Sequence, residues 1–300
     1  MLPFILFCKS FRDDVLRVKK LLESVIAFNQ DLIPFYLSVP EKDLDIFHQH
    51  IDFKSLQSTY NGIIELITDE AIVLSNPKSA LTSYYATKGY IGQQIVKAEA
   101  WRYLHCSAYL ALDSDCFFTK PFHLSNFIHE NGTPYTIMHD GHELLDLSES
   151  QGYTKVKEFY LKDSLLVKNE FGRTGEDYDF GPAPLIWSSK VWQSLELHLE
   201  QHHESIWEAF NRVPFEIRWY GETLLKYLSI PLYQIDPLFK CHHYEWQYQY
   251  YRDHPESIKN SEHFIGEVIQ SYWDESLRPT FAKKPWYSRW WKKIRLLRKS

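Results

Sequence analysis

The chain has few cysteines and no long uncharged apolar run. Four cysteines stand far apart among 300 residues, and none forms a Cys-x-x-Cys pair. This spacing does not indicate a zinc knuckle or a disulfide framework, so we expect a reducing, cytoplasmic compartment. No apolar stretch reaches the roughly 18 residues that a membrane-spanning helix needs. We therefore expect a protein that is soluble or peripheral to a membrane.

Acidic residues are missing from the last 18 positions. Residues 283–300 carry eight lysines or arginines and three tryptophans, whereas the other 282 residues carry 25 basic and 39 acidic side chains. On a helix, most of these basic residues would lie off an apolar stripe. This pattern is typical of a helix that binds to the surface of an anionic membrane. A tail helix packed on the body by its tryptophans is the alternative. The acidic body argues against a nucleic acid as partner.

Strand-like and helix-like segments alternate along the first half. Short apolar runs predict strands at residues 4–8, 35–39, 63–68 and 108–112. Helical spacing or composition predicts helices at residues 13–28, 42–50, 93–104, 190–201 and 222–228. This order predicts an α/β fold with a mixed sheet flanked by helices.

Two carboxylates follow the fourth predicted strand. Asp113 and Asp115 flank Ser114 directly after the apolar run, and apolar side chains return at Cys116. Ligands of α/β sheets collect at the carboxyl ends of strands. Hard oxygen donors there suit Mn²⁺ or Mg²⁺, which would act as a Lewis acid on a leaving diphosphate. A simple polar turn is the alternative interpretation.

The residues around these acids form a larger pattern. It consists of a Gln-Gln-x-x-Lys helix, a strand ending in Asp-x-Asp and a later proline, here Gln93, Gln94, Lys97, Asp113, Asp115 and Pro121. Over residues 85–125 the chain resembles a group of poorly characterised bacterial glycosyltransferases of the GT-A fold, and residues 215–221 are similar to a further Glu-x-x-x-Tyr-Gly segment of that group. The resemblance implies a Rossmann-like GT-A domain and a nucleoside-diphosphate sugar donor such as a UDP-sugar. It also implies a glycan or lipid-linked acceptor of the bacterial surface.

Donor-binding residues are expected on two segments. GT-A enzymes usually hold the nucleotide after the first strand, where Lys9, Arg12 and Asp13 stand in this chain. For Asp13, the cap of the following helix is an alternative role. Gln93, Gln94 and Lys97 lie within one helical turn and can face one groove. There Lys97 could bind a phosphate, and the amide of one glutamine could bind the sugar or the base. Ser114 completes the expected donor site.

Glycosyl transfer with inversion needs a carboxylate base. Glu216 matches the resembling segment and is our first choice, with Glu222, Asp177 and Asp179 as alternatives. The last two lie in a glycine-containing loop that suits a lid over the donor.

A third metal ligand is expected near the C-terminal end of the folded body. A histidine often fills this role in GT-A enzymes, and a neutral imidazole can join two carboxylates on Mn²⁺. His242 and His243 are adjacent and would point to opposite faces of a strand, so at most one serves. We favour His243, with an ordinary hydrogen-bonding histidine as the alternative.

These assignments divide the chain into a nucleotide-sugar half (1–125), an acceptor half of the same domain (126–282) and a membrane-associating tail (283–300). We expect the enzyme on the inner face of the cytoplasmic membrane.

Two other functions are alternatives to glycosyl transfer. A haloacid-dehalogenase-like phosphatase also uses Asp-x-Asp after a strand, but that motif usually opens its domain, whereas 112 residues precede Asp113. A carbohydrate-binding protein without catalysis could keep the same fold.

Overall fold

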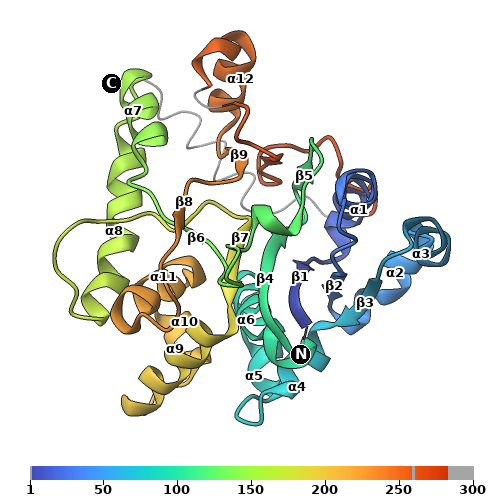
Figure 1. The fold of residues 1–300 in the computed structure, drawn as a ribbon, viewed down its shortest axis with the longest axis horizontal. Coiled ribbons are helices and arrows are strands. Elements are labelled where there is room, and N and C mark those ends of the chain that lie inside the picture. The colour runs from blue at the N-terminus through green and yellow to red at the C-terminus, as the bar shows by residue number, and fades with distance from the viewer. Residues whose placement is uncertain (1, 259–260, 283–300) are drawn as a thin grey trace.

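The structure, a computed structural model, describes residues 2–258 and 261–282 of the chain. Its central sheet has five strands in the order β3-β2-β1-β4-β7 (Figure 1). They are β1 (Leu2–Lys9), β2 (Phe35–Val39), β3 (Ile64–Thr68), β4 (Cys106–Asp113) and β7 (Leu185–Ser188). The first four pair in parallel, and β7 pairs antiparallel with β4. This mixed sheet with flanking helices confirms the predicted α/β class.

Side chains alternate between the two faces of β1. Ile5 and Phe7 belong to one buried cluster, whereas Phe4, Leu6 and Cys8 belong to another. Successive side chains of a strand point to opposite faces, so both faces of this sheet are covered. That is why the parallel strands are apolar runs and do not alternate with polar residues.

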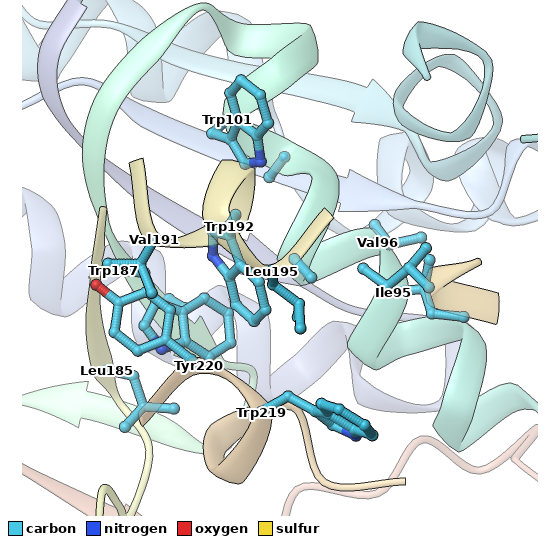
Figure 2. Packing of buried hydrophobic residues seen from close by; sticks show 14 of the residues in the cluster. Ile95, Val96, Trp101, Leu185, Trp187, Val191, Trp192, Leu195, Trp219 and Tyr220 are labelled. Atoms are coloured by element: carbon cyan, nitrogen blue, oxygen red, sulfur yellow. The ribbon is translucent and has the colours of Figure 1, made fainter. Parts of the chain in front are cut away.

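Helices cover one face with an aromatic core. They are α6 (Gly89–Leu104), α9 (Ser189–Gln201), α10 (Ile206–Arg212) and α11 (Glu216–Tyr227). Figure 2 shows Trp187 of β7 beside Trp192 of α9 and Tyr220 of α11. The two tryptophan rings meet edge to face at 4.9 Å, an arrangement that the charge distribution of aromatic rings favours. This core fixes α11 against the sheet.

The other face packs against α1 (Val15–Phe28), α2 (Leu44–His50) and a second sheet. This three-stranded sheet has the order β5-β10-β9, with β5 (Cys116–Phe118), β9 (Phe239–His242) and β10 (Gly266–Ile269). In Figure 1, β5 and β9 lie beyond the end of β4. A two-residue turn joins β4 to β5, so Ser114 and Asp115 stand between the two sheets.

The remaining elements are short or lie at the periphery. They are α3 (Phe53–Tyr60), α4 (Asp69–Ser75), α5 (Leu81–Ala86), α7 (His142–Ser150), α8 (Lys155–Glu170), α12 (Glu245–Asp253), β6 (Thr136–Ile137), β8 (Gln234–Ile235) and four 3₁₀ turns, of which η1 (Arg12–Asp14) precedes α1. Sequence patterns missed all of the helices in this list, together with α10 and β7, and they placed the start of α11 six residues late.

Two other expectations concern the whole chain. The basic tail, residues 283–300, lies outside the described residues, and so does its expected helix. Among the helices that the structure describes, none has both the length and the apolar character needed to cross a bilayer. The division at residue 125 stays a prediction, although β7 from the second half pairs with β4 from the first.

Candidate functional site

The carboxyl ends of four parallel strands meet at one edge of the main sheet. Asp113 is the last residue of β4, and its neighbour in the register is Lys9 at the end of β1. Ser38 is the last residue but one of β2, and Asp69 directly follows the end of β3. Ligands of α/β proteins bind at such an edge, because the strand ends and following loops project polar groups there.

Asp115 has one carboxylate oxygen without a partner. Its Oδ2 accepts a hydrogen bond from the backbone N–H of Ser271 at 2.8 Å, whereas Oδ1 is buried with no hydrogen bond from any described residue. Burial, and then the nearby charge of Asp113, raise the pKa of Asp115 to about 7. A buried carboxylate oxygen left alone is costly, so this atom is suited to a bound cation.

Asp113 is tied to α6 through Lys97. The Lys97 ammonium lies 3.1 Å from Oδ1 of Asp113 and 2.8 Å from Oε1 of Glu216. Burial by itself would lower the pKa of Lys97, but the two carboxylates outweigh it and raise that pKa. Lys97 is therefore charged and bridges Asp113 to the first residue of α11.

The two predicted glutamines differ in their surroundings. The Gln94 amide donates to the carbonyl of Pro214 at 2.9 Å and accepts from the backbone N–H of Glu216 at 3.2 Å. It thus holds the start of α11. Gln93 is half-buried, and its amide has no hydrogen bond to the part of the chain that the structure describes. Of the two, Gln93 is the one with free donors and acceptors for a ligand.

Ser114 is bonded to a residue that the sequence patterns missed. Its hydroxyl donates to Oδ2 of Asp14 at 3.0 Å, and Arg17 donates to Oδ1 of Asp14 at 2.8 Å. Burial raises the pKa of Asp14, against the opposing charge of Arg17. The sequence interpretation chose Asp13 instead. The alternative role of Asp13 as the helix cap is wrong, because the N-cap of α1 is Asp14. The side chain of Asp14 forms no capping hydrogen bond.

Lys9 and Arg12 are engaged within the protein. The Lys9 ammonium lies 2.8 Å from Oδ2 of Asp69, and Asp69 also accepts hydrogen bonds from Ser38 and Tyr84. The guanidinium of Arg12 lies over the Phe281 ring, 5.5 Å from its centre. Lys9 therefore stabilises the carboxyl edge of the sheet by pairing with Asp69, and its role as a ligand of the sugar donor stays a prediction.

The alternative bases are held in ion pairs. Glu222 is 1% exposed and makes two bonds to Arg173, at 2.5 and 2.8 Å. Asp177 pairs with Lys168 at 2.5 Å. Both cations belong to the segment that ends α8 and begins the following loop, so these acids anchor the loop that was expected to be a lid.

This loop also packs directly on α11. A side chain at Gly221 would collide with the ring of Phe180, so only glycine fits that close approach. Asp179 lies 3.4 Å from Arg218 and accepts a hydrogen bond from the backbone N–H of Gly181. Of the carboxylates named as bases, Glu216 is the one joined to Asp113, through Lys97.

The described hydrogen bonds of His243 do not include either aspartate. Its Nδ1 lies 3.6 Å from the Cys241 sulfur, and burial lowers its pKa to about 4, so the ring is neutral. Within residues 2–258 and 261–282, no group of three or more His, Cys, Asp and Glu side chains could hold a metal ion. The described donors for a cation are therefore the two carboxylates, and His243 as third ligand stays a prediction.

Comparison with known proteins identifies the family. Residues 1–273 match the model of DUF6492, a family of unknown function, and the chain belongs to that family. No curated protein matches the chain significantly. Among solved structures, the apo form of mouse xyloside xylosyltransferase 1 is similar over 89% of this chain and 97% of that chain, at 11% identity and a TM-score of 0.45. A likeness at that level carries no argument about activity, which has to rest on the chemistry of the site.

Proposed function

We propose that this protein is a metal-dependent glycosyltransferase. It would move a sugar from a nucleoside-diphosphate sugar, such as a UDP-sugar, to a glycan or lipid-linked acceptor. The observation that carries the proposal is the buried Oδ1 of Asp115, which has no partner among the described residues and lies near the charge of Asp113 at the carboxyl edge of the sheet. This edge is where α/β proteins bind nucleotides.

The donor set suits a hard divalent cation that is shared with a ligand. Two carboxylates are fewer ligands than Mn²⁺ or Mg²⁺ takes, and Mg²⁺ sites in particular are often completed by water and phosphate oxygens. Asp113 and Asp115 would hold the ion, with the diphosphate as its other partner. When bound, the ion would supply charge neutralisation to the departing nucleoside diphosphate.

The protein's own groups would then bind and position the reactants. Gln93 has an amide available to the donor, and Glu216 would take the proton of the acceptor hydroxyl. Its link to Lys97 keeps Glu216 close to Asp113. Glu216 shares its partner Lys97 with Asp113, whereas the described ion pairs of Glu222 and Asp177 are with Arg173 and Lys168, and this link to Asp113 favours Glu216 over both.

The composition of the tail and the resemblance support the acceptor and the location that we propose. A basic, tryptophan-rich segment binds anionic lipid surfaces, so residues 283–300 would keep the enzyme on the inner face of the cytoplasmic membrane. There it would meet a lipid-linked precursor of a bacterial surface glycan.

A screen of nucleotide sugars with and without Mn²⁺ tests the proposal. Mn²⁺-dependent release of a nucleoside diphosphate is the expected result. Metal-dependent binding without release would indicate a non-catalytic protein of the same fold. Release of inorganic phosphate from simple phosphate esters would instead indicate a phosphatase.

A further inference from the structure

One buried ammonium joins the aspartate pair to the acid that begins α11. The Lys97 nitrogen is 3.1 Å from Asp113 and 2.8 Å from Glu216, and only 4% of the Lys97 side chain is exposed. The Glu216 side chain is 8% exposed, and that of Asp113 is 24% exposed. Asp113 therefore reaches the surface of the site, while Lys97 and Glu216 lie behind it.

Helix α6 fixes Glu216 at a second point. Gln94 stands one helical turn before Lys97 and bonds to the backbone of Pro214 and Glu216. The same helix face thus holds both the main chain and the carboxylate of Glu216. Lys97 is held in turn, because its carbonyl accepts a hydrogen bond from the Tyr109 hydroxyl at 2.7 Å.

The charges of this group do not balance. Lys97 carries one positive charge between two carboxylates, and Asp115 adds a further acid that has no cation partner among the described residues. A cation at Asp113 would compete with Lys97 for that carboxylate, and Glu216 would remain as the partner of Lys97. The Lys97 ammonium already serves two carboxylates, so it has little donor capacity left for a phosphate.

We propose that Lys97 is a positioning residue that couples cation binding at Asp113 to the placement of Glu216, and not a ligand of the donor phosphates. The inference rests on the proposed glycosyl transfer for its catalytic part. Its electrostatic part, the competition between Lys97 and a cation for Asp113, is independent of any reaction.

Kinetics of Lys97→Met test the catalytic part. Affinity for UDP at saturating Mn²⁺ should stay close to that of the wild type, whereas kcat for transfer should fall about as far as in Glu216→Gln, by roughly 10²–10⁴-fold. Because both changes disable the same base, Lys97→Met combined with Glu216→Gln should be no slower than the slower of the two single variants. Losses that multiply, or a loss confined to UDP affinity, would overturn the proposal.

Calorimetry with Mn²⁺ alone tests the electrostatic part without any activity. Removing the competing ammonium should tighten Mn²⁺ binding several-fold in Lys97→Met. Unchanged or weaker binding would overturn the proposal even where no transfer is detected. If the wild type itself releases no nucleoside diphosphate with any donor, the proposed function fails, and this measurement still decides whether Lys97 competes for Asp113.

Two variants separate these effects from a loss of stability. Lys240→Met is the control, because the Lys240 side chain is only 7% exposed and pairs with Glu143. Its melting temperature shows how much stability is lost when a buried ammonium is removed. Lys240→Met should leave the split between kcat and UDP affinity unchanged. Lys97→Arg keeps the charge and should recover part of kcat; no recovery in a variant that folds as well as the wild type would count against the proposal.

Discussion

Asp14 accepts a hydrogen bond at 3.0 Å from the hydroxyl of Ser114, the residue between the two acids of the site. This bond ties the turn after β4 to the start of α1, across 100 positions of the sequence. Arg17 holds Asp14 from its other oxygen and also reaches the carbonyl of Asp274. The turn is therefore braced by segments from both ends of the described chain.

Alanine at Asp113 or at Asp115 should abolish Mn²⁺-dependent binding of UDP while the protein stays folded, because both acids stand at a strand end and not in the apolar core. Isothermal calorimetry measures the affinity. Asp31→Ala is the matched control, since Asp31 is an exposed carboxylate just before β2, at the opposite edge of the sheet. Wild-type affinity in both site variants would remove the proposed metal site.

Cation affinity should rise with pH through about 7. The pKa of Asp115 is raised to about 7 by burial and by Asp113, so its carboxylate is protonated below that value and cannot bind a cation. Calorimetric titrations with Mn²⁺ at pH values on either side of 7 give the profile. An affinity that stays constant across this range would show that Asp115 does not take part.

The same group should make the fold less stable as the pH rises. The pKa of Asp115 in the folded protein lies above the value near 3.9 in the unfolded chain. Its stabilising contribution to the free energy of unfolding is therefore fully present below about pH 4 and is lost as the pH rises through 7. Asp115→Asn should therefore melt higher than the wild type above pH 7 and nearly equally at acid pH. A gain of 1 kcal/mol corresponds to about 2–4 °C for domains of roughly 150–250 residues, so we expect about 2 °C for a chain of 300 residues. Identical melting curves at alkaline pH would contradict the burial of this charge.

Glu222→Gln should lower stability and spare catalysis. Glu222 is 1% exposed and is bound by Arg173 through two bonds, so the change leaves a guanidinium without its counter-charge. Breaking such a pair costs about 3–5 kcal/mol, and the partial exposure of Arg173 favours the lower end. Urea unfolding measures the loss, and kcat per folded molecule should remain near wild type. A stable variant without transfer activity would move the base from Glu216 to Glu222.

Deleting residues 283–300 should release the protein from anionic vesicles, because eight cations and three tryptophans are removed together. Co-sedimentation measures binding, and donor hydrolysis in solution should stay close to normal. High salt should release the full chain only in part, since the apolar side chains still enter the interface when charge is screened. No co-sedimentation of the full chain at low salt would rule out the membrane role.

The strands of the parallel sheet could be predicted because both of their faces are buried. Continuous apolar runs result, and the run at Phe35–Val39 matches the observed β2 residue for residue. The acids after β4 could be located for the same reason, since a polar pair that ends such a run must stand at the strand end. The type and order of the four parallel strands therefore followed from the local pattern.

The partners of the site residues could not be predicted in this way. Lys97 and Glu216 are 119 positions apart, and their contact depends on how α11 packs on α6. Asp13 and Asp14 are adjacent in the sequence and lie in the same 3₁₀ turn. Which of the two side chains is buried beside Ser114 depends on how that turn is rotated against the sheet. Edge strand β7 has four residues, too short for a periodic signal.

The position of β4 has a consequence for any shortened form of the protein. β4 is bonded on one side to β1, about a hundred positions earlier, and on the other to β7, some 75 positions later. A fragment that ends at residue 125 would leave the apolar run of β4 as an open edge, which is a template for pairing with other chains. Such a fragment should aggregate, and the intact chain should fold slowly because both neighbours of β4 come from distant segments.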